Sequence, residues 1–119
     1  MESITQLLSS LSIELKRGTL VLLVMSQLHT EEYGYSLVQK LDEKGLPIEP
    51  GTLYPLLRRL EKQGILQSRW DTSESRPRKF YVISDKGHEV YSQLKEEWRR
   101  ASRRIEELLL EEEKEDGTH

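Results

Sequence analysis

Residues 50–64 read PGTLYPLLRRLEKQG and form the most regularly patterned segment of the 119-residue chain. Leucines recur at i, i+3, i+4 and i+7, the spacing of one apolar stripe along an α-helix; they are Leu53, Leu56, Leu57 and Leu60. Gly64 then acts as a stop signal. Pro55 is tolerated in the first turn of a helix, where little or no intrahelical bond is lost. We therefore predict a helix over residues 52–63 that begins near Gly51 or Thr52.

The face of this helix opposite the leucines is small, aromatic and basic. At about 100° per residue it carries Pro55, Arg58 and Lys62, with Tyr54 and Arg59 at its borders. A helix that reads a DNA groove needs short residues at its N-terminus, donors for phosphates or base edges, and N–H groups that favour an anion. The residues that meet these needs are Gly51, Thr52, Tyr54, Arg58 and Arg59. The alternative is a solvated face whose arginines confer only solubility.

Three further helical segments are predicted before residue 50. Residues 3–15 form an amphipathic helix or arm, because apolar residues recur there at helical spacing; they are Ile4, Leu7, Leu8, Leu11 and Leu15. The segment from Lys16 to Leu28 contains the run LVLLVM, which is apolar almost all round and indicates the most deeply buried helix. After the polar stretch 29–32, a third helix opens at Tyr33 and ends at Gly45.

One hairpin is predicted after the patterned helix, with strands over residues 66–72 and 78–84. The tip of this hairpin holds three cations within four residues, namely Arg76, Arg78 and Lys79. Pro77 stiffens this loop, so that less conformational entropy is lost on binding. The cations suit a phosphate backbone. The alternative is a charged hairpin that protects its own edge from aggregation.

After the N-terminal arm, the order of three helices, a hairpin and a long helix predicts a mainly α, α+β winged helix-turn-helix. Such a fold has a three-helix core, a two-stranded β wing and here a long C-terminal dimerisation helix. We expect residues 1–15 to be a dimer-contacting arm and residues 16–84 to be the DNA-binding domain. Residues 85–113 form the dimerisation helix and residues 114–119 an acidic, frayed tail.

The last helix, capped by Ser84 and Asp85, carries a heptad seam that predicts a homodimer. The seam consists of Tyr91, Leu94, Trp98, Ala101, Ile105 and Leu108. About 29 residues at 1.5 Å rise extend roughly 40 Å, beyond a domain of this size. The arm leucines Leu7, Leu8 and Leu11 supply the other half of the contact. Trp98 can pack in this seam or stack on a flat ligand there.

Charge is distributed unevenly along the chain. Its 18 basic and 21 acidic residues leave a net charge of −3, which by itself does not indicate a nucleic-acid binder. Residues 50–80, however, carry seven bases against three acids, whereas residues 105–119 carry seven acids against one base. The basic middle therefore keeps double-stranded DNA as a candidate partner.

Several protein classes are excluded by what the sequence lacks. It has no cysteine, which removes disulfide frameworks, thiolate zinc sites and cysteine nucleophiles and suits a reducing compartment. His29, His88 and His119 have no further ligand at metal-binding spacing, and no phosphate loop or nucleophile elbow is found. We expect no enzyme activity, metal or cofactor. No apolar run suits a membrane span and no signal peptide opens the chain, so we expect a cytoplasmic protein.

Three stretches together resemble the PadR family of bacterial transcriptional regulators. They are KRGTL at 16–20 with YGY at 33–35, PGTLYPLLRRLE at 50–61, and RPRKFY at 76–81. The resemblance spans about residues 15–110 and implies a dimeric winged-helix repressor of the short subfamily, which binds an operator with dyad symmetry. Glu49 stands where the family often has a small hydroxyl residue.

The resemblance also implies roles for particular residues. DNA-contact positions fall on Gly51, Thr52, Tyr54 and Pro55, on Arg76, Arg78 and Lys79 in the wing, and on Lys16 and Arg17 as weaker candidates for phosphate contact. Some members sense drugs by binding flat aromatic compounds between tryptophans of the dimerisation helix, where Trp98 stands here. A winged-helix module that docks an acidic protein remains the alternative from another functional class.

Overall fold

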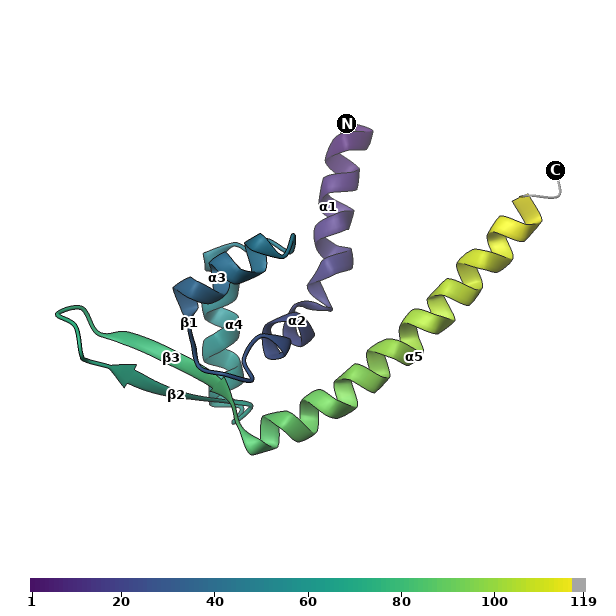
Figure 1. Ribbon diagram of the computed structural model, residues 1–119. Helices are drawn as coiled ribbons and strands as arrows, with labels where there is room; N and C mark the ends of the chain where they lie inside the picture. The colour runs from purple at the N-terminus through teal and green to yellow at the C-terminus, as the bar shows by residue number, and fades with distance from the viewer. Residues whose placement is uncertain (117–119) are drawn as a thin grey trace.

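The computed structural model describes residues 1–116, which form five helices and three strands (Figure 1). In chain order these are α1 (Ile4–Arg17), α2 (Leu20–Ser26), β1 (Glu32–Tyr33), α3 (Gly34–Glu43), α4 (Pro50–Lys62), β2 (Leu66–Asp71), β3 (Arg78–Ile83) and α5 (Asp85–Asp116). We call α2–α4 and the three strands the head. In Figure 1, α1 and α5 extend away from the head, and the wing formed by β2 and β3 points in another direction.

The dimensions reflect these projections. The molecule measures 66 × 37 × 23 Å and its radius of gyration is 18.2 Å, against about 14 Å for a compact chain of this length. Much of α1 and α5 therefore lies outside the core of its own chain.

The core lies inside the head, as the winged-helix prediction requires. Leu53 and Leu57 are fully buried, and they pack with Val24, Met25 and Leu28. The prediction that the run 20–25 forms the most deeply buried helix is wrong, since α2 buries only Val24 and Met25 whereas α4 buries four leucines. Leu22 and Leu23 are half-buried, because they line a cavity between α2 and α5. The segment also contains two helices, since α1 ends at Arg17 and α2 begins at Leu20.

The sheet has three antiparallel strands in the order β1-β3-β2. The hairpin of β2 and β3 was predicted, and its register pairs Leu66 with Ile83 and Asp71 with Arg78. Strand β1 was not predicted, because two residues are too few to show an alternating pattern. It pairs Tyr33 with Phe80, so the segment before α3 is fastened to the wing.

The predicted start of α4 is wrong by one to two residues. The helix begins at Pro50, which occupies its first position and loses no intrahelical bond. Pro55 therefore lies in the second turn, where it removes the bond to the carbonyl of Gly51. Gly45 and Gly64 adopt φ of 76° and 79° after α3 and α4, as predicted for glycines that end helices.

The start of α5 is built as predicted, around Ser84. Its buried hydroxyl lies 2.6 Å from the carbonyl oxygen of Gly64 and accepts a hydrogen bond from the N–H of Gly87 at 2.9 Å. The predicted end at residue 113 is wrong, since α5 continues to Asp116. Residues 114–116 favour the helix, and the first stop signal is Gly117. The rest of the predicted tail, residues 117–119 with His119, lies outside the described residues.

Within residues 1–116, no helix combines the length and the apolar character needed to cross a membrane. In the same part of the chain, no three His, Cys, Asp or Glu side chains gather as metal ligands.

Candidate nucleic-acid interface

Helix α4 presents its basic face to solvent. Burial of the leucine stripe turns Pro55, Arg58, Arg59 and Lys62 outward, as the periodicity predicts. Within residues 1–116, none of these three cations forms an ion pair, so their charges are available to a partner. Thr52 is also exposed at the start of the helix.

The first turn of α4 has free space around Gly51, whereas the Tyr54 side chain one turn later is packed against α3. A Cβ built on Gly51 would meet no atom within 4 Å, so nothing in the chain requires a glycine there. Tyr54 is half-buried, because its ring packs against Gly34 at the start of α3. A Cβ on Gly34 would lie 2.4 Å from Cε1 of Tyr54, which explains the glycine in the YGY motif. Tyr54 is therefore less free to reach a groove than its neighbours on α4.

The wing cations differ in what they contact. Arg76 lies in the exposed loop and forms no ion pair with the described residues. Arg78 opens β3, pairs with Glu74 at 3.0 Å, and stacks over the Tyr33 ring. The prediction that Lys79 lies at the wing tip is wrong, because Lys79 lies within β3. Its Nζ is 2.8 Å from Oε1 of Glu61 on α4, so it joins the wing to this helix.

The Glu61 carboxylate also accepts a hydrogen bond from Ser68 of β2. Hydrogen bonds from Lys79 and Ser68 lower the pKa of Glu61, and its carboxylate in turn raises the pKa of Lys79. The wing is thereby held against α4 at a defined position.

A second set of contacts fastens the wing to β1 and to the residue before it. Tyr33 donates a hydrogen bond to Asp71 at 2.6 Å and stacks on Phe80 with ring centroids 3.9 Å apart. Glu31 pairs with Arg69 at 2.6 Å. The hydrogen bond from Tyr33, followed by those from Ser73, lowers the pKa of Asp71 to about 2. The base of the wing is therefore fixed, while its loop at residues 72–77 stays exposed.

A cavity of about 430 Å³ lies between α4, the wing and the N-terminus of α3; we call it the helix–wing cavity. Its wall combines aromatic and cationic side chains and contains no acidic residue. The lining residues are Tyr33, Gly34, Tyr35, Tyr54, Arg58, Trp70, Arg78, Lys79 and Tyr81. Trp70 is exposed on β2, and Tyr81 is almost completely buried on β3.

Lys16 and Arg17 are placed differently from the prediction. They lie in the last turn of α1, not at the start of the buried helix, and there they complement the helix dipole. The next residue, Gly18, lines a cavity with Trp98 and Ala101 of α5. The structure therefore does not bring this pair together with the basic face of α4.

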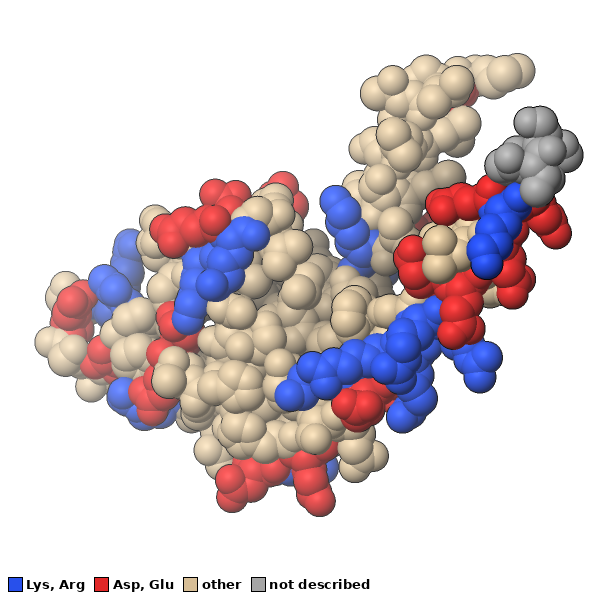
Figure 2. All heavy atoms as spheres, turned by 45° about the vertical axis from the view of Figure 1, so that its right-hand side comes forward, with Lys and Arg blue, Asp and Glu red and all other residues tan. Residues whose placement is uncertain are grey.

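The predicted dimer residues divide into two groups. Tyr91 and Leu94 pack against the core of their own head. From Trp98 onward the seam is exposed, and so is the apolar stripe of α1, where no residue is buried. Exposed members are Leu7, Leu8, Leu11, Trp98, Ala101, Ile105 and Leu108. Figure 2 shows the projecting part of α1 with almost no charge, beside α5 with a basic block followed by acidic side chains.

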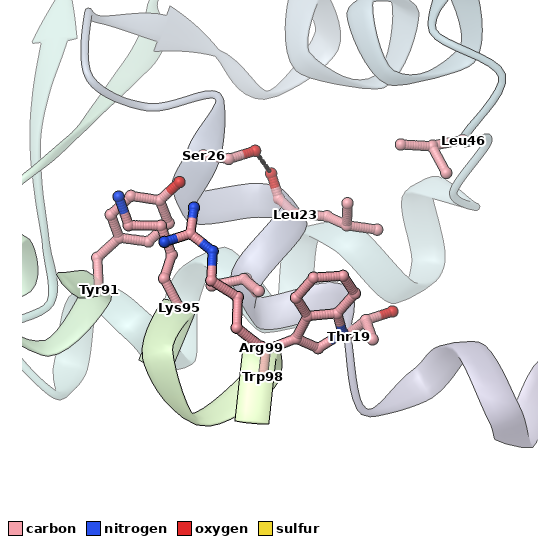
Figure 3. Close-up of a pocket in the computed structure, with 9 residues that line it drawn as sticks. Thr19, Leu23, Ser26, Leu46, Tyr91, Lys95, Trp98 and Arg99 are labelled. Atoms are coloured by element: carbon pink, nitrogen blue, oxygen red, sulfur yellow. Dashed lines mark hydrogen bonds between the residues drawn. The ribbon is translucent and has the colours of Figure 1, made fainter. Parts of the chain in front are cut away.

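A second cavity, of about 380 Å³, lies between α2 and α5 (Figure 3). The ring of Trp98 lies towards Thr19 at the start of α2, and Leu46 contributes from the loop before α4. The remaining lining residues are Leu22, Leu23, Ser26, Tyr91, Lys95 and Arg99. Apolar walls with two cations at one side suit a flat ligand that carries a polar or anionic group.

Sequence reasoning missed the residues that connect α4 to the wing. Glu61 and Ser68 sit in segments correctly predicted as helix and strand, but no local pattern reveals that their side chains meet. The alternation of Lys79, Tyr81 and Ile83 along β3 places them on one face of the sheet. Only the packing of that face against α4 shows that Tyr81 lines a cavity.

Known proteins with similar sequences and structures share this architecture. The family described as "Transcriptional regulator PadR-like family" matches residues 21–93. The transcriptional regulator Rv3488 of Mycobacterium tuberculosis is 38% identical over 81 residues, which cover 68% of this chain and 69% of the relative. The crystal structure of a PadR family regulator from Eggerthella lenta superposes with a TM-score of 0.83 at 48% identity, over 87% of this chain and 92% of that one. A PadR-like transcription factor from bacteroid fragilis gives 0.70 at 31% identity, over 83% and 98%.

Proposed function

The chain belongs to the PadR-like family of transcriptional regulators, and from that membership we propose that it represses transcription by binding an operator with dyad symmetry as a homodimer. It is a regulator rather than an enzyme. A repressor acts where the chromosome is, so the proposal implies a cytoplasmic protein.

The arrangement of α4 beside the wing carries the proposal. The helix buries one face and exposes Arg58, Arg59 and Lys62 on the other. The wing, which Lys79 joins to α4 at Glu61, carries Arg76 in its exposed loop. Each protomer places α4 in a major groove and its wing on the neighbouring backbone. Two protomers related by a two-fold axis then bind half-sites about one helical turn apart.

The apolar surfaces that the head leaves uncovered support homodimerisation. The stripe of α1 has no buried residue, and the seam of α5 from Trp98 onward is exposed; both helices project from the head (Figure 1). On α5, the basic block of Arg99, Arg100, Arg103 and Arg104 precedes the acidic segment. A second copy of the helix running in the opposite direction sets basic against acidic residues, which supports a self-association.

Recovery of genomic fragments tests the function directly. The purified protein is mixed with fragmented genomic DNA at about 0.15 M salt, where non-specific phosphate binding is weak, and the retained DNA is sequenced. We expect enrichment of an inverted repeat. Recovery without any enriched sequence would contradict an operator-binding regulator and favour the protein-docking module.

Gly51→Ala is expected to stabilise the fold and weaken DNA binding. Alanine at an unstrained helical position that meets no atom within 4 Å raises the free energy of unfolding by about 0.4–1 kcal/mol. Its methyl group, however, obstructs the close approach of the helix N-terminus to DNA, and we expect roughly ten-fold weaker binding. Thermal unfolding and fluorescence anisotropy on the recovered operator measure the two effects.

Gly18→Ala is the matched control for this test, since a Cβ there also meets no atom within 4 Å. It should leave the affinity for DNA unchanged. Gly51→Ala that gains stability at full affinity would show that the start of α4 does not approach DNA closely.

The cavity beside Trp98 supports an effector that relieves repression. A flat aromatic ligand stacked on Trp98 would touch both α2 and α5, and so change the angle between the two heads (Figure 3). A multidrug sensor is the broader form of this proposal. Ligand titration in a Trp70→Phe background should quench the fluorescence of Trp98. Quenching that persists without change in the single variant Trp98→Phe, which retains Trp70, would place the ligand elsewhere.

A further inference from the structure

The hydroxyl of Tyr81 is the unexplained polar group of the helix–wing cavity. The side chain is 6% exposed, and its hydroxyl forms no hydrogen bond with the described residues. Within those residues, no fully enclosed side-chain nitrogen or oxygen lacks a partner. The hydroxyl, which has none, therefore opens onto the cavity that Tyr81 lines. Tyrosine hydroxyls at such depth normally have a partner.

The groups around this hydroxyl suit an anion. Arg58 of α4, which forms no ion pair in the described chain, and Lys79 of β3 line the same cavity. The nearby Glu61 is already occupied, since it accepts hydrogen bonds from Lys79 and Ser68. Burial raises the pKa of Tyr81, which keeps its phenol protonated and able to donate.

Two further features of the helix–wing cavity also suit an anion. Tyr54 also lines this cavity, and its hydroxyl has no hydrogen-bond partner among the described residues. The N-terminus of α3 contributes Gly34 and Tyr35 to the wall, and no side chain caps it. A helix N-terminus favours a negative charge.

We propose that the helix–wing cavity binds one backbone phosphate of DNA, and that the Tyr81 hydroxyl donates a hydrogen bond to it between the charges of Arg58 and Lys79. The inference rests on the proposed function, because α4 and the wing must both lie on DNA. The inference adds a phosphate site between α4 and the wing, formed by Tyr81, Arg58 and Lys79. DNA is favoured over a free anion because Arg58 belongs both to the cavity wall and to the exposed face of α4.

Tyr81→Phe tests the site, since it removes one oxygen and no internal hydrogen bond. A hydrogen bond to a charged acceptor is among the stronger ones, so we expect about ten-fold weaker binding to every duplex. The dependence of affinity on salt should keep its slope, because no charge is lost. Arg58→Gln should instead flatten the slope by about one ion per contact. Anisotropy over a salt series measures both variants.

Ser92→Ala is the control, because it also removes one hydroxyl but from an exposed position on α5, which lines neither cavity. It should bind DNA like the wild type. Thermal unfolding of Tyr81→Phe should occur at the same or a higher temperature. A fall in that temperature together with the affinity would indicate a structural role and overturn the proposal.

Two other results would also overturn it. Wild-type affinity in Tyr81→Phe would remove the phosphate contact but leave the regulator intact, whereas failure of the wild type to bind any DNA would remove the proposed function as well. A third arm titrates inorganic phosphate into a Trp98→Phe background and follows Trp70. Saturable binding that needs Tyr81, with DNA affinity unaffected by Tyr81→Phe, would assign the cavity to a free anion.

Discussion

Ile105→Glu is expected to give a monomer that binds DNA at least about 100-fold more weakly than the wild type. Ile105 lies in the middle of the exposed α5 seam and is 57% exposed in the single chain. In the proposed dimer it is buried, and a carboxylate without a partner is costly there. Binding two half-sites through linked heads gains about 10²–10⁴ in avidity, which a monomer loses.

Light scattering should report the chain mass of 14.0 kDa instead of twice that value, and anisotropy should report the loss of affinity. The circular dichroism spectrum should show that the head stays folded, because its core contains no residue from this part of α5. The matched control is Leu110→Glu, the same kind of change five residues later and about 140° around the helix. A dimeric Ile105→Glu with full affinity would refute the seam as the dimer contact.

Gly87→Ala is expected to have the largest effect on folding, a loss of about 3 kcal/mol in the free energy of unfolding. Gly87 is buried in the first turn of α5, where the helix passes the end of the segment that leads into β2. A Cβ there would lie 2.2 Å from the carbonyl oxygen of Ile65 and 2.7 Å from Cγ1 of Ile83. Backbone cannot move aside as a flexible side chain can, so α5 must shift from the head.

The measurement is thermal unfolding, and we expect the midpoint to fall by roughly 10 °C or more. Gly18→Ala serves again as the control, because its Cβ would meet open space. Its midpoint should stay level or rise slightly. Equal midpoints for the two variants would mean that the close approach of α5 to Ile65 does not hold the helix in place.

Much of the fold could be predicted because its signals are local. The leucine stripe of α4, the glycines at 45 and 64 and the alternation in β2 and β3 each act within a few residues. The missed features depend on distant partners. Strand β1 exists only because Tyr33 and Phe80 pair across the sheet, and Lys79 leaves the predicted wing tip because Glu61 lies opposite it on α4.

The candidate site divides in the same way. Periodicity alone turned Arg58, Arg59 and Lys62 outward, since burial of the leucines leaves only the opposite face of α4 for solvent. It could not separate Arg76, which is unpaired among the described residues, from Arg78, which is paired with Glu74. Nor could it show that Tyr91 and Leu94 pack on their own head while Ile105 and Leu108 are exposed.

The sequence by itself therefore determined the winged-helix order, the basic face of α4 and the family, since each depends on neighbouring residues in a short segment. Only the tertiary structure decided how the wing is fastened to α4 and β1, and which tyrosine hydroxyl opens into the cavity between them. The reason is physical. A helix or strand is specified by its own periodicity, but a cavity is formed by side chains from segments far apart in the chain, whose meeting depends on the packing of the whole head.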